Sequence, residues 1–233
     1  IYKQLEHLFR DLEDDDTVRA IVLAGKGKGF CSGGNVEEVI APLLEHDVRD
    51  TLRFTRMTGA VVRHMRRLSK PIVAAVHGTA AGAGTVLALA SDLRVMGEHS
   101  SFAFLFPRVG LTGADMGAAW LLPRGVGQGI ASEWLLLGDK VPAAECYRTG
   151  LANRVVPTEQ VLATATELAR KLATGPTLAH GMTKRMLVNE AHMDFEAAIE
   201  QEAQAQALLL KAKDHRNFYD AWQRKEKPTW EGR

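Results

Sequence analysis

The sequence predicts an α/β protein, in which strands and helices alternate along most of the chain and a region of helices alone follows. Two observations support this fold class. The continuous apolar run 71–76 and the mostly apolar segments 18–24, 93–96 and 154–156 are typical of strands, and the segments between them show helical periodicity. After Pro157 the apolar residues recur only at helical spacing. We therefore expect a core over 1–157 and a helical subdomain over 158–233.

Strands and helices alternate along the first half of the chain. Leu5, Leu8, Phe9 and Leu12 share one face of an N-terminal helix, and the acidic run 14–16 ends that helix. Pro71 ends a later amphipathic helix and begins a strand that the sequence HGTAAGAG, read as a tight turn, closes. The expected elements are a strand at 18–24, helices at 36–45 and 50–68, a strand at 71–76, a helix at 85–90 and a strand at 93–96.

The second half begins with a strand and becomes helical. The expected elements are a strand at 101–106, helices near 117–122, 128–137 and 143–149, a strand at 154–156, and helices at 159–173, 176–190 and 194–212 before a tail ending in KPTWEGR. The helix at 194–212 carries more apolar residues than a lone helix should present to water. It is either a core helix or a contact between subunits.

Composition narrows the classes of function. A formal net charge of +1 over 233 residues offers no field to hold a polyanion, so we expect no nucleic-acid partner. Cys31 and Cys146 form no Cys-x-x-Cys or Cys/His pattern, so we expect no metal site and a reducing, cytoplasmic setting. The N-terminus reads as an amphipathic helix, and glycines interrupt the apolar stretch 71–90, so we expect neither an export signal nor a membrane span.

Two glycine-rich turns follow strands. The first, AGKGKGFCSGGNV at 24–36, lacks the glycine six residues before the lysine of a phosphate loop and has Phe30 where a dinucleotide fingerprint requires its third glycine. Phe30 also occupies the position of the first glycine of a G-x-S-x-G nucleophile elbow around Ser32. Nucleoside triphosphates, nicotinamide cofactors and serine nucleophilic catalysis are therefore not indicated.

The second turn, VHGTAAGAGTVLALASD at 76–92, leads from a strand into a helix. The first N–H groups of a helix have no partner within it, and the helix dipole favours negative charge near them. Such groups suit a developing oxyanion. Taken alone, either turn is equally consistent with a purely structural tight turn.

Through the two glycine-rich turns and several further segments, the chain resembles the crotonase family, also called the enoyl-CoA hydratase/isomerase superfamily. The segments that carry the resemblance are FCSGGNV, PIVAAVHGTAAGAGTVLALASDLRV, LLPRGVG, LLLGDKVPAAE, GLANRVVP and the tail pattern A-W-x-x-K. The resemblance implies a crotonase-like spiral of ββα units with a C-terminal helical oligomerisation region, homotrimers or hexamers, and an acyl-CoA substrate in which coenzyme A is the only cofactor-like group. The family also has an N-terminal strand with an Asn-Ala element, and this sequence starts after it.

The resemblance also implies roles for particular residues. The N–H groups of Gly34 and Ala83 correspond to the two donors of the family's oxyanion hole, which clamps the thioester carbonyl. Further substrate-binding positions are Ser32, Asn35, Val36, Val86 and Arg108 near the turns, and Lys225 and Lys227 in the tail, where family members approach the CoA phosphates, commonly from a neighbouring subunit. The alternative for the lysines is a solvated terminus.

The sequence departs from the family at the positions of the catalytic carboxylates. Family hydratases use two glutamates, and here Val86 and Arg108 occupy both positions. Since hydration needs an acid and a base, the two-glutamate mechanism does not carry over. Asp115 in GLTGADMG resembles the catalytic aspartate of dienoyl-CoA isomerases, with a spacing different by one residue; the alternative is a helix N-cap. Arg108 either binds a substrate carboxylate or enolate, or faces solvent.

The sequence therefore predicts an enoyl-CoA hydratase/isomerase family enzyme that works through an oxyanion-stabilised enolate with a non-standard acid/base set. The alternatives are an acyl-CoA hydrolase, or an acyl-CoA or RNA binding protein without hydratase turnover. Glu133 reads as a solvated helix residue, Cys31 as a small buried side chain, and His77 as a histidine with no metal-like partner.

Overall fold

The computed structural model describes residues 1–233 except for the side chain of Val36, so the role expected for that side chain lies outside the described residues. Four parallel strands form the main sheet in the order β1-β2-β4-β7: β1 (Ile21–Ala24), β2 (Ile72–Val76), β4 (Leu93–Gly97) and β7 (Arg154–Val156). A second sheet has the order β3-β5-β6, with β3 (Thr79–Ala81) parallel to β5 (Ser101–Ala103) and β6 (Lys140–Pro142) antiparallel to β5.

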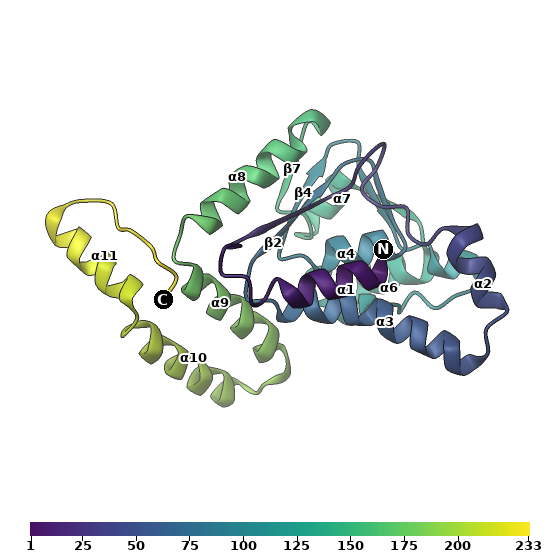
Figure 1. The fold of residues 1–233 in the computed structure, drawn as a ribbon. Coiled ribbons are helices and arrows are strands. Elements are labelled where there is room, and N and C mark those ends of the chain that lie inside the picture. The colour runs from purple at the N-terminus through teal and green to yellow at the C-terminus, as the bar shows by residue number, and fades with distance from the viewer.

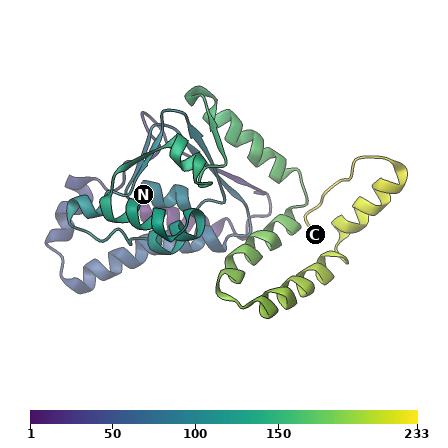
Figure 2. The ribbon, with the colours of Figure 1, turned by 180° about the vertical axis from the view of Figure 1, so that it is seen from behind.

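Helices cover both faces of the main sheet (Figures 1 and 2). On one side lie α1 (Tyr2–Asp11), α3 (Val48–Arg67) and α4 (Ala83–Ala90), and on the other side lies α8 (Val161–Ala173). The buried strand β2 packs against the helices on both faces of the sheet, because its alternate side chains point to opposite faces. Ile72, Ala74 and Val76 join the larger apolar core, and Val73 and Ala75 pack with residues of α8 in a second one.

The remaining elements are mostly short. They are a π-helical turn η1 (Val36–Ile40), α2 (Ala41–Leu44), the 3-10 turns η2 (Phe106–Val109), η3 (Thr158–Gln160) and η4 (Glu190–His192), α5 (Ala118–Val126), α6 (Gln128–Leu137), α7 (Ala143–Arg148), α9 (Thr177–Asn189), α10 (Phe195–Leu209) and α11 (Lys213–Arg224).

The last three helices and the tail form what we call the C-terminal arm, residues 177–233, which extends away from the two sheets (Figure 1). The tail folds back along α11, where the carboxylate of Asp214 accepts the N–H groups of Glu231 at 2.6 Å and Gly232 at 3.0 Å. At its base, α9 is tied to the core by a buried ion pair between Lys184 and Asp92 at 2.7 Å. None of the described helices has the length and apolar character needed to cross a bilayer.

The fold confirms the predicted α/β class with a helical C-terminal region and corrects several elements. Residues 79–81 form strand β3 rather than a turn, since pairing with β5 fixes them. The strand expected at 101–106 ends at Ala103, and a 3-10 turn with Pro107 follows. The helix expected at 36–45 divides into η1 and α2, and α11 was not predicted. The division at 157/158 stays a prediction, and α8 after it packs on the main sheet.

Candidate active site

The two glycine-rich turns lie against each other. Cys31 in the first turn forms a parallel bridge with Ala80 of β3. Its carbonyl oxygen accepts the Ala81 N–H at 2.8 Å, and its own N–H donates to the Thr79 oxygen at 3.4 Å. The first turn therefore runs as a partial strand beside β3 and brings Gly33 and Gly34 to the N-terminus of α4.

Glycine is required where these backbones meet. A Cβ on Gly84 would lie 2.3 Å from the Cys31 carbonyl oxygen, and one on Gly33 would lie 3.0 Å from the Ala81 oxygen. Gly82, the residue before α4, has a φ of 52° and a ψ of −124°, a conformation in which a side chain would be strained. The small residues of both turns thus permit the close approach on which the site depends.

The N-terminus of α4 is fixed by polar contacts. The Thr85 hydroxyl lies 2.7 Å from the Ala80 oxygen and 3.1 Å from the Ala103 oxygen, and it accepts the Ala103 N–H. The Gly82 N–H donates to the same Ala103 oxygen at 2.9 Å. These hydrogen bonds attach the first turn of α4 to β3 and β5, so the second sheet fixes the position of the helix start.

Two backbone donors are left beside this helix start. Ala83 is the first residue of α4, so its N–H has no acceptor within the helix. Within the described part of the chain, neither this N–H nor that of Gly34 donates to a protein acceptor. A carbonyl oxygen held by two such donors is stabilised most when it becomes negatively charged, because the donors are already in place.

Asp115 lies near the same turns, in the loop before α5. Its carboxylate accepts the Met116 N–H at 2.8 Å, and burial raises its pKa above the ordinary value of 3.8. Burial also raises the pKa of the Tyr2 hydroxyl, and the charges of Cys31 and Asp115 raise it further. Tyr2, Cys31 and Asp115 therefore share one neighbourhood. The alternative of a helix N-cap is not observed, since Gly117 precedes α5 and no side chain caps it.

The two positions that carry glutamate in family hydratases differ in their surroundings. Val86 lies one helical turn beyond Ala83 and is 0% exposed. Arg108 lies in η2, is exposed, and forms an ion pair with Asp139. Its Nε donates to the Leu137 oxygen at 3.5 Å, so the guanidinium points to the end of α6.

The other expected binding residues lie apart from one another. Ser32 is exposed, and the side chain of Asn35 accepts the N–H groups of Glu37 and Glu38 at 2.8 Å and 3.0 Å, which caps η1. Lys225 ends α11 and, like Lys227, is exposed. Because α11 lies in the C-terminal arm, away from the central body that contains α4, one copy of the chain does not bring the end of α11 to the turns (Figure 1).

Sequence reasoning missed Thr85 and Tyr2. Thr85 follows the glycines directly, and a threonine in the first turn of a helix is a signal for local capping bonds. Tyr2 left no signal, because its neighbours Cys31 and Asp115 come from distant parts of the chain. Among the described residues, no group of His, Cys, Asp and Glu is placed to hold a metal ion.

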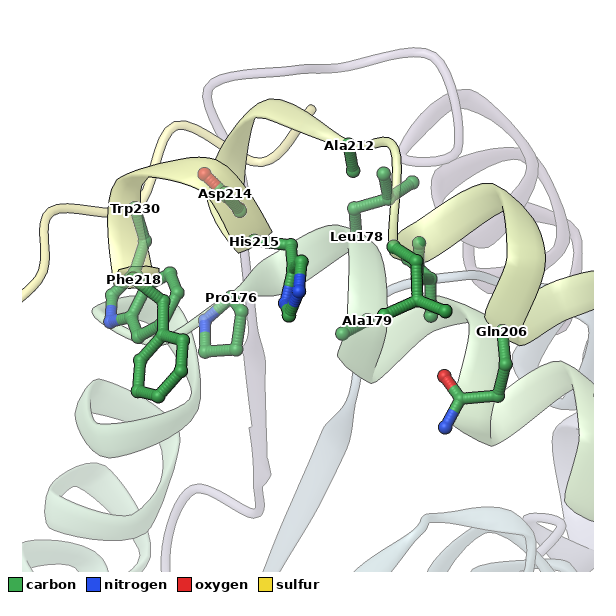
Figure 3. A pocket seen from close by; sticks show the side chains of 11 residues that line it. Pro176, Leu178, Ala179, Gln206, Ala212, Asp214, His215, Phe218 and Trp230 are labelled. Atoms are coloured by element: carbon green, nitrogen blue, oxygen red, sulfur yellow. The ribbon is translucent and has the colours of Figure 1, made fainter. Parts of the chain in front are cut away.

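An apolar pocket of about 300 Å³ lies in the C-terminal arm, away from the glycine turns (Figure 3). The rings of His215 and Phe218 extend from α11 toward the start of α9. The lining residues are Pro176, Leu178, Ala179, Gln206, Leu209, Leu210, Ala212, Asp214, His215, Phe218 and Trp230. Since the Asp214 carboxylate already accepts two N–H groups of the tail, the pocket offers few free polar groups.

A parallel sheet covered by helices, with one helix that starts directly at a glycine-rich turn, places the chain among the α/β proteins. The profile of the family described as Enoyl-CoA hydratase/isomerase matches residues 1–233. The chain belongs to this family, which confirms the resemblance to crotonases. Enzymes of this family act on acyl-CoA thioesters.

Individual relatives agree with this assignment. The chain is 32% identical over 233 residues to the 1,2-epoxyphenylacetyl-CoA isomerase of Escherichia coli K12, covering 100% of this chain and 88% of that protein. It is 35% identical over 206 residues to 4-chlorobenzoyl coenzyme A dehalogenase-1 of Arthrobacter, covering 88% and 73%. A crystal structure of a Streptomyces coelicolor A3(2) protein, assigned as an enoyl-CoA hydratase, superposes with a TM-score of 0.98 at 50% identity and covers 100% of this chain and 84% of that one.

Proposed function

We propose that this protein is an isomerase or lyase that acts on an acyl-CoA thioester through an enolate held at the glycine turns. The observation that carries the proposal is the close approach of the first turn to the start of α4, where a Cβ on Gly33 would lie 3.6 Å from the Ala83 nitrogen, together with the N–H groups of Gly34 and Ala83, which donate to no protein acceptor in the described part of the chain. The thioester oxygen accepts both donors, and its bond to them strengthens as negative charge develops. The relatives named as a CoA isomerase and a CoA dehalogenase support a CoA thioester as the substrate class.

Asp115 is the acid/base residue of this proposal. Its carboxylate takes a proton from the carbon next to the thioester carbonyl, and the electron pair moves onto the oxygen held by the two donors. The protonated Asp115 then returns the proton to another carbon of the conjugated system, so that no water is consumed. A half-buried carboxylate suits this role because its raised pKa makes it a stronger base than a free aspartate.

Hydration of crotonyl-CoA is expected to be slow or absent. Val86 and Arg108 supply no carboxylate, and Arg108 is paired with Asp139. A single acid can move a proton within the substrate, but the two positioned glutamates with which family hydratases activate water and deliver the α-proton are absent.

In the assembled form, Lys225 and Lys227 bind the CoA phosphates of a neighbouring copy. This part of the proposal is supported by the distance between α11 and α4 in one chain and by the exposed apolar residues of the C-terminal arm. The expected assembly is a trimer or hexamer.

The first test removes one donor. Ala83→Pro deletes the N–H at the first helical position, where proline is otherwise tolerated, and Ala83→Gly keeps it. We expect Ala83→Pro to reduce turnover by about 10²- to 10³-fold and Ala83→Gly to reduce it far less. Turnover is measured on short, long and aromatic acyl- and enoyl-CoA thioesters by mass spectrometry, and binding of nonreactive analogues by calorimetry. Free CoA as the product would indicate a hydrolase, and absence of binding to all of them would contradict the proposal.

A further inference from the structure

The end of α4 opposite the candidate site is occupied by a cation. Arg94 of β4 places its guanidinium against carbonyl oxygens at the C-terminus of α4. Its Nη1 donates to Ala88 at 3.4 Å, to Leu89 at 3.3 Å and to Ser91. Its Nε donates to the Leu151 oxygen at 2.6 Å. All of these acceptors are uncharged.

The surrounding charges leave this cation without a carboxylate of its own. Asp92, the nearest acid, already pairs with Lys184 at 2.7 Å and with Arg66 at 3.7 Å. It also accepts the Ile72 N–H at 2.8 Å. Among the described residues, Arg94 forms no ion pair. Three cations, Arg94, Lys184 and Arg66, therefore share the carboxylate of Asp92 near the C-terminus of α4.

The pKa of Arg94 is lowered to about 10, mainly by burial; the charge of Asp92 opposes this lowering and the charge of Arg66 adds to it. The guanidinium is still charged at neutral pH. A partly buried cation that relies on carbonyl dipoles is costly to keep for packing alone, since its removal from water is only partly offset by neutral acceptors. Its position on the axis of α4 suggests a second use.

We infer that Arg94 is a positioning residue for the carbonyl site: it fixes α4 from its C-terminus and adds positive charge along the axis that ends at the Ala83 N–H. This inference rests on the function proposed above. A helix of eight residues is about 12 Å long, so the guanidinium lies roughly 12 to 15 Å from a bound thioester oxygen. A unit charge at that distance, with an effective dielectric of about 20, changes the rate of enolate formation about five- to tenfold.

The test compares Arg94→Gln with Arg94→Lys. Arg94→Gln removes the charge and most of the bonds, and we expect kcat to fall about five- to tenfold with KM changed less than twofold. Arg94→Lys keeps the charge and is expected to recover kcat to within about twofold of the wild type. Arg148→Gln, which removes an exposed arginine paired with Glu145 on α7, is the matched control and should leave kcat unchanged.

A second measurement separates charge from structure. Butyryl-CoA and benzoyl-CoA, labelled with ¹³C at the thioester carbonyl, report the polarisation of that bond by difference infrared spectroscopy. The carbonyl band should move to lower frequency on binding to the wild type, and by less in Arg94→Gln. Should that variant fail to fold, Arg66→Gln, which removes a nearby charge but none of the α4 bonds, is expected to show a smaller change in the same direction.

Each result decides the inference. A wild-type shift that the variants leave unchanged overturns the role of Arg94 and preserves the proposed function. A wild-type protein that binds neither thioester, or binds without any shift, overturns both. A loss of melting temperature in Arg94→Gln with normal kcat in the folded fraction shows that Arg94 acts on stability alone.

Discussion

At the scale of single residues, the candidate site depends on residues with a small side chain or none. Gly84 allows the backbone of the first turn to pass at a distance that no side chain would permit. Ala83 contributes through its N–H rather than through its methyl group. Such positions can be tested by adding one carbon atom.

Gly84→Ala is expected to destabilise the protein. The new Cβ would lie 2.3 Å from the Cys31 carbonyl oxygen, so the two turns must separate, and overpacking of this kind costs about 1 to 3 kcal/mol. Turnover should fall further than stability, because the Gly34 N–H moves with the first turn. Urea denaturation and steady-state kinetics measure the two effects.

Gly129→Ala is the matched control. This glycine lies within α6, and an added Cβ would have no neighbour within 4 Å. The substitution should raise stability by about 0.5 to 1 kcal/mol and leave turnover unchanged. Equal effects of the two substitutions would contradict the close contact between the turns.

Asp115→Asn separates catalysis from stability. Asparagine retains an acceptor for the Met116 N–H but removes the base, so turnover should fall about 10²- to 10⁴-fold. In the wild type, the acid limb of kcat/KM should lie above pH 3.8, since burial raises the pKa of this carboxyl. Unchanged activity in Asp115→Asn would assign the chemistry to another acid.

The same substitution has a pH-dependent effect on stability. The folded protein binds a proton at Asp115 more readily than the unfolded chain does, because the pKa is raised on folding. The linked stabilisation is complete below the ordinary pKa and is lost as the pH rises through the raised value. Asp115→Asn should therefore melt at a higher temperature than the wild type at neutral pH, with the difference shrinking as the pH falls toward 4.

At the scale of elements, the Lys184–Asp92 pair joins α9 to the main sheet. Lys184 is 6% exposed and also donates to the Lys70 oxygen at 3.0 Å. Its pKa is lowered by burial, while Asp92 opposes that shift. The base of the C-terminal arm is thus held by a buried charge as well as by packing.

Lys184→Ala is expected to reduce the free energy of unfolding by about 1 to 3 kcal/mol, because it removes a buried charged donor while Asp92 keeps Arg66 and the Ile72 N–H as partners. Lys213→Ala removes a cation from an exposed pair with Glu231 and should cost less than about 1 kcal/mol. Chemical denaturation of both variants gives the comparison. Similar losses would show that the buried pair does not anchor α9.

At the scale of the whole molecule, the C-terminal arm exposes large apolar side chains. Phe195 is 73% exposed and Trp222 is 67% exposed, on α10 and α11. Large apolar side chains left exposed in this way are typical of a face that another molecule covers. A second copy of the chain is the partner that the proposed assembly requires.

Light scattering should give a mass near three or six times 25.5 kDa. Trp222→Glu, which places a charge on this surface, should lower that mass and weaken binding of the CoA moiety. A wild-type monomer at every concentration would contradict both the assembly and the role of Lys225 and Lys227 in a neighbouring copy.

The sequence by itself determined the elements whose signals are local. The apolar run of β2, the helix α6 and the strand β7 follow from continuous or periodic apolar residues, and both glycine turns are recognisable between strand and helix. Local patterns of this kind depend on residues within a few positions of one another, so one sequence carries them. Family membership followed from the order of such segments.

The tertiary structure decided the contacts between distant residues. Only the fold pairs Cys31 with Ala80, makes a strand of 79–81, directs Arg108 to Asp139 and places the Arg94 guanidinium between Leu151 and the C-terminus of α4. These contacts join residues up to 57 positions apart, and no local pattern encodes them. The candidate site belongs to this second group, because two turns become one pair of donors only when strand pairing brings their backbones together.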